Sequence, residues 1–504
     1  MYRIYFRALV YCLLSLGLAP TTLWATTMNY IDPSCTNDGN GTGESCAGSP
    51  GGVGAYNTWA SVTFASDNTY AQKAGTTWTI SANQSILITA SGASDSARII
   101  LTRYGTGADP IINATGNHYG IAITGARSFI TLDHFEVYGV SMSAGSDNGL
   151  VRLCDSAGVF CTSITITNMT LHDAVSAGGG SSAQGIMAWC TSCIITDNTI
   201  YNIANDAINV VNVGSGNTVI SRNIVQNVST SSVFGDGFQL SGTAATVTMI
   251  DNYCDHTSVE IKHCLIDQTT TTTSYYANNK FLMSTLDAPS GTTYAVELDG
   301  PTGIVVGNIL RGGHVCLQTS NANYVIYGNL LTGCYGFGWV FSGTNNTATF
   351  SNNTIDPTSF TGIIAVDLSG SVANTVGLYN NAITNAGTGV KKAGSVTVID
   401  RNNLFFGNTA NGSSYSPDAS SVLADPLYIN RASSDYRTQG TSPARRAGLS
   451  GYPCLDVRGR ACYPDRPDIG AYQATSGDPA STRSAASARG AASARSAAST
   501  RTAR

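Results

Sequence analysis

The sequence has few charged residues. Asp, Glu, Lys and Arg make up 11% of the chain, and only five residues are lysines. No window of the sequence shows a convincing helical period in its apolar residues. So few charged residues cannot cover the solvent-exposed surface of a helical protein. The abundance of Gly, Ser, Thr and Asn instead favours closely stacked turns.

Long hydrophobic runs are also missing. The longest N-terminal run, from Ala8 to Leu18, is too short to span a membrane. It follows Arg3 and Arg7 and precedes Ala25, an arrangement typical of a secretory signal peptide that is cut after Ala25. We therefore expect no transmembrane span, and a mature protein that is secreted, either into a periplasm or to the extracellular surface.

Several common catalytic motifs are absent as well. The chain has no serine-hydrolase elbow and no pair of histidines at zinc-binding spacing. Its formal charge is -5, but the signal segment carries +2 and the residues after 475 carry +4, so the body between them carries -11. An acidic body argues against nucleic acid as a partner.

A repeat dominates what is present. An asparagine followed two residues later by an apolar residue recurs at spacings of 21 to 29 residues, nine times within 205 residues. A recurrence in this range marks a stacked-repeat architecture. The nine asparagines are Asn198, Asn223, Asn252, Asn279, Asn308, Asn329, Asn353, Asn381 and Asn403.

Short β-branched strands flank each asparagine, and turns rich in Gly, Asn, Ser and Asp separate them. Such strands can stack coil on coil at about 4.8 Å, each pairing with its copies above and below. The fold class predicted is therefore all-β, a single-stranded right-handed parallel β-helix. We expect the asparagines at one corner, hydrogen-bonding along the stack and tolerating a left-handed backbone.

The same pattern divides the chain into five parts. Residues 1–25 form the signal peptide, 26–59 an N-terminal lead-in and cap, and 60–423 the β-helix, with early coils expected around 77–80, 86–88 and 97–101. Residues 424–475 are expected to cap the last coil and cover its strand edges. Residues 476–504, rich in Arg, Ala and Ser, cannot bury a core and are expected to be disordered.

Twelve cysteines remain after the signal peptide, and they fall into close neighbours along the chain. An even count in local pairs favours six short-range disulfides in an oxidising compartment, although sequence alone does not fix connectivity. The Cys-x-x-Cys after Trp189 lies among strands rather than at a helix N-terminus, which favours a structural bridge over a redox centre. The neighbours are Cys35 and Cys46, Cys154 and Cys161, Cys190 and Cys193, Cys254 and Cys264, Cys316 and Cys334, and Cys454 and Cys462.

The C-terminal motifs resemble a known group of proteins. Ala424-Asp425-Pro426-Leu427, Thr441-Ser442-Pro443 and Pro467-Asp468-Ile469-Gly470 are similar to the closing segment of exported bacterial parallel β-helix proteins. Those proteins include pectate-lyase-like enzymes and, more loosely here, chondroitinase-or-alginate-lyase-like enzymes. The resemblance covers roughly 29–473 and implies the fold more strongly than an activity. We expect a polysaccharide as partner, because a polymer can lie along the long faces of such a solenoid, and we expect a monomer.

Polar and ionisable residues recur beside or within the second strand of successive coils, which predicts a polar stripe along one face. A polymer can lie along such a stripe. The candidate substrate-binding residues are Asp206, Asn209, Asp236, Gln239, His314 and Gln318.

The densest cluster runs from Asp251 to Asp267 and includes Lys262 and His263, the two candidate catalytic residues. Elimination at a uronate needs a base for the C5 proton and a cation for the carboxylate, and a lysine can be that base if its pKa is lowered. Glu260 followed by Lys262 loosely resembles chondroitinase-or-alginate-lyase-like enzymes. Those enzymes place an arginine about one coil later, whereas the first arginine here is Arg311.

Carboxylates on the same face are candidate ligands for Ca²⁺, a cation that prefers oxygen. The candidates are Asp236, Glu260, Glu297 and Asp299.

Three functions follow from the stripe. β-Elimination of a uronic-acid polymer is favoured over hydrolysis. An inverting glycoside hydrolase would use paired aspartates such as Asp206 and Asp236, with carboxyl groups about 6.5–9.5 Å apart. The third candidate, from another class, is a carbohydrate-binding surface rod that cleaves nothing.

Overall fold

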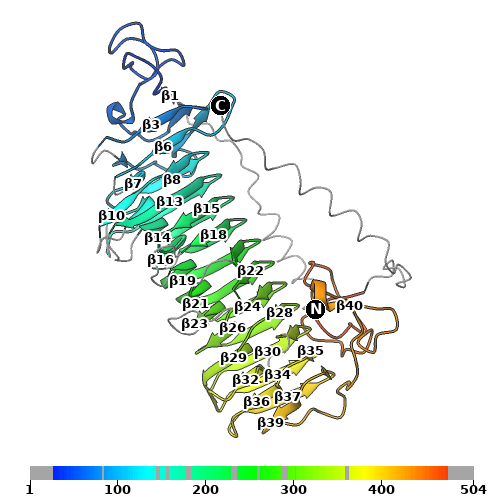
Figure 1. The fold of residues 1–504 in the computed structure, drawn as a ribbon. Helices are drawn as coiled ribbons and strands as arrows, with labels where there is room; N and C mark the ends of the chain where they lie inside the picture. The colour runs from blue at the N-terminus through cyan, green and yellow to red at the C-terminus, as the bar shows by residue number, and fades with distance from the viewer. Residues whose placement is uncertain are drawn as a thin grey trace, which may run out of the picture.

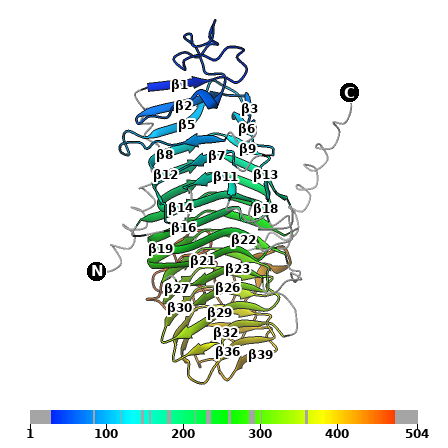
Figure 2. The ribbon, with the colours of Figure 1, turned by 90° about the vertical axis from the view of Figure 1, so that its left-hand side faces the viewer.

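The structure is a computed structural model that describes residues 27–81, 85–116, 119–143, 148–154, 158–177, 183–212, 214, 216–228, 235–257, 261–284, 293–300, 302–357 and 362–474. The predicted signal peptide, the predicted tail and Glu260 lie outside these residues. Within them, strands stack in register as the rungs of one long parallel β-helix (Figures 1 and 2). The all-β, parallel architecture is confirmed, while the handedness remains a prediction.

Each complete coil contributes strands to three parallel stacks, which we call faces 1, 2 and 3 in chain order. Face 1 contains β4 (Ile86–Ile88), β7 (Ile121–Ile123), β11 (Asn148–Leu153), β14 (Ala183–Thr196), β16 (Ile208–Asn212), β19 (Asp236–Ile250), β21 (His263–Ala277), β23 (Tyr294–Asp299), β26 (Val315–Ser320), β29 (Phe337–Thr344), β32 (Ile364–Leu368), β36 (Thr388–Lys392) and β39 (Ala410–Ser413). The long strands β14, β19 and β21 turn the corner and continue into face 2.

Face 2 starts from the N-terminal strand and also contains β33 (Ser371–Val372), which pairs with the end of β29 near the corner. Its other strands are β1 (Thr27–Ile31), β2 (Asn68–Lys73), β5 (Ile99–Tyr104), β8 (Ser128–Asp133), β12 (Cys161–Thr167), β17 (Asn217–Ser221), β24 (Gly303–Val306), β27 (Tyr324–Tyr327), β30 (Thr347–Ser351), β34 (Thr375–Tyr379) and β37 (Thr397–Arg401).

Face 3 is a separate sheet. Its strands are β3 (Thr77–Thr79), β6 (Ile111–Asn113), β9 (Glu136–Tyr138), β10 (Ser141–Ser143), β13 (Thr170–Ala177), β15 (Thr199–Ile203), β18 (Ile224–Val228), β20 (Tyr253–His256), β22 (Lys280–Met283), β25 (Ile309–Arg311), β28 (Leu330–Thr332), β31 (Thr354–Asp356), β35 (Ala382–Thr384) and β38 (Leu404–Phe406). The sequence predicted three early coils at 77–80, 86–88 and 97–101. The strands there, β3, β4 and β5, lie on faces 3, 1 and 2, so these segments are three successive strands of about one coil.

Inward side chains of the three faces fill one continuous apolar core. On face 1 the inward positions pair in register from coil to coil, for example Phe238 with Leu265 and Leu317 with Trp339. These four side chains are fully buried. Each buried side chain of this size stabilises the fold by about 1.5–3 kcal/mol.

The asparagine ladder between faces 2 and 3 is confirmed. Each of the first eight asparagines donates from its side-chain nitrogen to the side-chain oxygen of the next, at 2.9–3.1 Å. The left-handed backbone falls one residue earlier than expected, for example at Arg222 and Asp251, whose φ values are 53° and 58°. The asparagine therefore points inward at the corner while its neighbour makes the turn.

All six local cysteine pairs are disulfides in the structure. The pair after Trp189 joins Cys190 to Cys193 within β14, as expected for a structural bridge. No helix among the described residues is long and apolar enough to cross a membrane.

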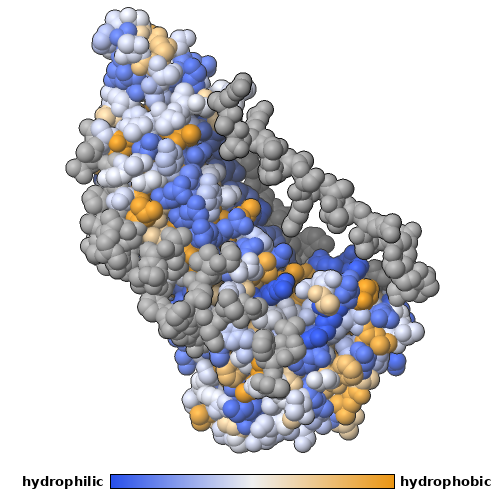
Figure 3. Space-filling model, in the orientation of Figure 1, coloured by the Kyte–Doolittle hydropathy of each residue, from blue (hydrophilic) through white to orange (hydrophobic). Residues whose placement is uncertain are grey.

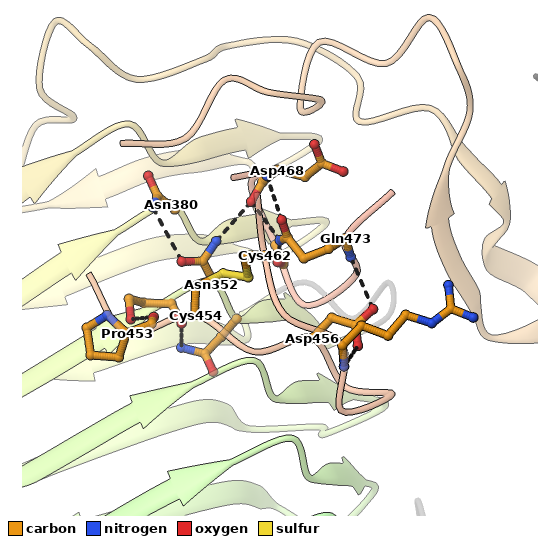
Figure 4. The surroundings of a disulfide bond; sticks show 12 residues. Asn352, Asn380, Pro453, Cys454, Asp456, Cys462, Asp468 and Gln473 are labelled. Carbon is orange, nitrogen blue, oxygen red and sulfur yellow. Dashed lines mark hydrogen bonds between the residues drawn. A yellow bond between two sulfur atoms is a disulfide. The ribbon is translucent and has the colours of Figure 1, made fainter. Parts of the chain in front are cut away.

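The C-terminal segment 424–474 differs from the expected cap, because it lies along the side of the later coils (Figure 1). It includes the antiparallel strands β40 (Tyr428–Asn430) and β41 (Asp435–Thr438). Asn352 and Asn380 at the turn donate to the backbone of Asp468 and Leu449, at 2.9 Å each, near the Cys454–Cys462 disulfide (Figure 4).

Residues 414–422, which precede the C-terminal segment, contact the last coil of the β-helix instead. Val422 forms a parallel bridge with Leu404 in the last coil, and the Tyr415 hydroxyl donates to Asp400 at 2.5 Å. At the opposite end, β1 pairs with β2 as the first rung of face 2, so part of the lead-in belongs to the stack itself.

Candidate functional site

The outward side chains of face 1 form a column in strict register. In chain order the column contains Arg152, Met187, Asn209, Gln239, Ile266, Glu297 and Gln318. We call it the polar column. Asn209 donates to Gln239 at 2.8 Å, and Gln318 donates to Glu297 at 2.8 Å. The polar stripe predicted from the sequence is thus present for Asn209, Gln239 and Gln318.

A second group lies three residues earlier on each strand and is buried. Asp206 is 2% exposed, Asp236 is 5% exposed and His263 is fully buried. The structure brings these three side chains together with Glu297, whose side chain is 17% exposed. We call these four residues the acidic cluster.

His263 lies between two carboxylates. Its Nδ1 is 2.7 Å from Asp236 Oδ1, and its Nε2 is 2.8 Å from Glu297 Oε2, close enough for an ion pair although not aligned as a hydrogen bond. Tyr294 stacks on the imidazole with ring centroids 5.2 Å apart. Burial alone would lower the pKa of His263, but the contacts with Asp236 and Glu297 raise it above its ordinary value. The imidazolium form, with two N–H donors, suits this position.

Asp206 occupies the neighbouring rung. Its Oδ1 accepts from the backbone N–H of Asp236 at 2.9 Å, and its Oδ2 accepts from Asn209 at 3.0 Å. Burial and the nearby charge of Asp236 raise the pKa of Asp206 to about 7. Asp206 therefore exchanges a proton near neutral pH, which is the property required of a general acid or base.

A glycine lets the strands that carry Asp236 and His263 pack closely. The position after Asp236 is Gly237, where an added Cβ would lie 2.7 Å from the Cys264 carbonyl oxygen and 2.9 Å from Cys254 Sγ. Cys264 on face 1 directly follows His263, and its disulfide with Cys254 joins face 1 to face 3. The backbone that carries Asp236 and His263 is therefore held closely.

The two candidate catalytic residues differ in placement. Lys262 is exposed directly before β21, so the burial that a lysine base was expected to have is not found. His263 is buried, so its side chain contacts Asp236 and Glu297 and not solvent. His314 does not join the polar column; it packs edge-on against Tyr335 at 5.1 Å and also contacts Phe337.

The described carboxylates do not fit the expected calcium site. Asp236 and Glu297 bind opposite nitrogens of His263, so the imidazole occupies the space between them. Asp299 accepts instead from Ser320 and Asn321, at 2.7 Å each. Glu260, the fourth candidate, lies outside the described residues. No chemical step is therefore assigned to calcium.

The sequence alignment of the second strands places Asp206, Asp236 and His263 at equivalent positions, and the structure confirms that Asp236 and His263 are register partners. The burial of these residues, the contact of His263 with Glu297 and the stacking of Tyr294 were missed from the sequence. A signal was present, because Tyr294 lies three residues before Glu297, as Asp236 lies three before Gln239.

A polar cleft of about 600 Å³ lies elsewhere, at the last coils. Lys392, Asp400, Arg401 and Tyr415 line it. Arg401 is paired with Asp418, and Lys392 donates to the Val396 carbonyl oxygen, so its cations already bind within the protein. The acidic cluster, which contains a histidine held between two carboxylates, is the better candidate for chemistry.

No family model and no curated relative match the chain. Similar solved structures include XylC in complex with xylose (11% identity, 89% of this chain and 98% of that chain, TM-score 0.47) and pectate lyase Pel9A (14% identity, 90% and 98%, TM-score 0.35). A third is the A-module of the Azotobacter vinelandii mannuronan C-5 epimerase AlgE6 (12% identity, 71% and 91%, TM-score 0.39). At these identities and TM-scores the likenesses carry no argument about function.

Proposed function

We propose that this protein acts on an extracellular polysaccharide that lies along face 1, and that it cleaves a uronic-acid polymer by β-elimination. The observation that carries the proposal is the acidic cluster beneath the polar column. Ion pairs and shifted pKa values of this kind concentrate where proteins move protons. The column above the cluster offers amide and carboxylate groups at one rung spacing, about 4.8 Å.

The roles follow from exposure. Lys262 is exposed beside the buried His263, so its ammonium group can reach a bound sugar and serve as the base or as the cation beside the uronate carboxylate. His263 is a positioning residue, because it contacts Glu297 rather than solvent. Glu297 is the member of the acidic cluster that reaches the surface, and Asp206 holds an exchangeable proton near pH 7.

One assay separates this proposal from its rivals. The purified mature protein is incubated with a panel of uronic-acid polymers, with and without a chelator. Elimination leaves an unsaturated sugar that absorbs ultraviolet light, hydrolysis leaves new reducing ends alone, and binding without cleavage leaves neither. If the ultraviolet-absorbing product still forms in the presence of chelator, the elimination needs no metal ion. Its loss in chelator would support the predicted calcium site.

A non-catalytic glycan-binding rod is the second candidate. The observation that favours it is the burial of Asp206, Asp236 and His263, whose contacts are made within the protein. An inverting hydrolase is less well supported, because its two carboxyl groups must flank a bound sugar and a water, whereas Asp206 and Asp236 are 2% and 5% exposed.

A further inference from the structure

Two cysteines and a histidine meet in the core of the β-helix. Cys254 and His256 are two residues apart on β20, so both side chains point inward from face 3, and Cys264 lies at the start of β21 on face 1. The two sulfur atoms and a ring nitrogen of His256 all lie within 4.8 Å of one another. The three residues are fully buried, beneath a surface that is mostly hydrophilic or neutral in the view of Figure 3.

His256 has a ring nitrogen without a partner. Its Nδ1 accepts from the backbone N–H of Val228 at 3.4 Å, which is a long hydrogen bond. Its Nε2 is buried and has no hydrogen-bond partner among the residues that the structure describes. Buried polar atoms are rarely left unsatisfied, so this nitrogen needs an explanation. Imidazole nitrogens and cysteine sulfurs are both common metal ligands, and a metal site explains why they lie together here.

The two sulfur atoms are joined as a disulfide, so a metal ion can bind only after the bridge is reduced. In that reaction two thiol groups of a small reductant give up two electrons and two protons and join as a disulfide of their own. The S–S bond of the bridge breaks, and each cysteine sulfur takes one electron and one proton. A metal ion then displaces the two thiol protons, which pass to solvent. Ligation at His256 Nε2 moves the ring proton to Nδ1, and only the long hydrogen bond from Val228 is lost.

The ligand set favours Cu(I) over Zn²⁺. Structural Zn²⁺ almost always takes four ligands, whereas this group offers three. Met283 is the register partner of His256 on the next rung and is 3% exposed, so its thioether lies in the same part of the core. Thiolates and thioethers are the soft ligands that suit Cu(I).

A second group of this kind is a poorer site. Asp32, Cys35 and Cys46 also place their ligand atoms within 4.8 Å of one another. However, Asp32 is paired with Lys73 at 2.8 Å, and Cys46 is exposed. Its carboxylate therefore already binds within the protein.

We propose that Cys254, His256 and Cys264 form a Cu(I)-binding site that becomes available when their disulfide is reduced. The bound ion replaces the disulfide as the link between face 3 and face 1. Because Cys264 directly follows His263, this link holds the backbone of the acidic cluster in place when the bridge is open. The site goes beyond the proposed function and does not depend on it.

The test uses the full mature chain, reduced with a dithiol, freed of reductant without oxygen and titrated with Cu(I) against a chromophoric chelator. We expect the reduced chain to hold one Cu(I) tightly, with sulfur and nitrogen ligands in its X-ray absorption spectrum. His256→Phe keeps a ring of similar size but offers no nitrogen. It should weaken this site about tenfold or more, since even the residues that support a metal ligand are worth about 10–100-fold in affinity.

Replacing Cys316 and Cys334 together by Ser gives the matched control. That pair is also a fully buried disulfide that begins on face 1, but no third metal-ligating side chain lies beside it in the described part of the chain. The control should keep the tight Cu(I) site after reduction.

Equal Cu(I) binding by His256→Phe, with circular dichroism showing the native fold, would overturn the inference, and so would equal binding by the unreduced chain. A reduced chain that holds Zn²⁺ more tightly than Cu(I) would overturn the choice of ion. None of these measurements uses a glycan, so the proposed function stands or fails separately.

Discussion

The asparagine ladder and three members of the acidic cluster, Asp206, Asp236 and His263, are both rows of buried polar side chains at equivalent places on successive coils. In the ladder every member is the same neutral amide, and each donates to the next at 2.9–3.1 Å. In the acidic cluster the members differ, and their contacts shift the pKa of Asp206 and His263. Repetition of one neutral group therefore supports the coil, whereas unlike ionisable groups in the same kind of row shift the pKa values of one another, which is the property on which the proposed function rests.

Removing the central cation of the acidic cluster should have the largest effect. His263→Ala leaves the buried Asp236 and the partly exposed Glu297 without their shared partner, so we expect a loss of about 3–5 kcal/mol in the free energy of unfolding. Denaturant unfolding measures it, and the elimination assay should show no product. A loss below about 1 kcal/mol is typical of solvent-exposed ion pairs and would contradict the burial of this cluster.

Breaking the ladder should cost somewhat less. Asn279→Ala leaves the Asn252 amide without its acceptor and the Met249 carbonyl without its donor, and we expect about 2–3 kcal/mol of lost stability. Asn217→Ala, at an exposed position on face 2, is the control and should change stability by at most about 0.5 kcal/mol. Equal effects of the two substitutions would contradict a structural ladder.

The pH dependence of stability separates the two rows further. The folded state raises the pKa of Asp206 to about 7 from 3.8, so it binds more protons than the unfolded state across that interval. The stabilising contribution of Asp206 is full below pH 4 and is lost as the pH rises through about 7, with a slope of at most about 1.4 kcal/mol per pH unit. Denaturation at several pH values should show this slope in the native chain and a shallower one in Asp206→Asn. Asn279→Ala, which removes no titrating group, should keep the native slope.

Lys262→Ala should have the smallest effect on stability, about 0.5 kcal/mol or less, because the side chain is exposed. Activity against uronic-acid polymers should nevertheless disappear if Lys262 is the base or the cation of the reaction. A fully active Lys262→Ala variant would move the chemistry to Glu297.

Periodicity made the fold predictable, but the site only in part. The nine asparagines report one corner of every coil, and that corner alone sets the coil length and the direction of stacking. It does not say which residue of a distant strand faces outward, because the stretch between corners varies by several residues. Thus Gln318 was placed correctly in the polar column, whereas His314, four residues earlier, packs against aromatic rings instead.

The misplaced cap has the same origin. The motifs of 424–475 identify a closing segment, yet its partners are set by three-dimensional contacts that no local pattern reveals. Arg431 binds the buried Asp356 of β31, and Ala471 donates to Thr354 at 2.9 Å. These contacts join residues more than 70 positions apart, so composition and spacing could not indicate them.

That lateral segment also constrains the order of events during folding. Its seat is built from side chains of several rungs, among them Leu330, Ala382 and Leu404, so it can form only after those rungs have been wound. Contacts between parts so distant in the chain form late and slowly. A nascent or proteolysed chain that ends near residue 423 would therefore expose an apolar patch along the side of the later coils. Such a chain would tend to aggregate before it could bind a ligand.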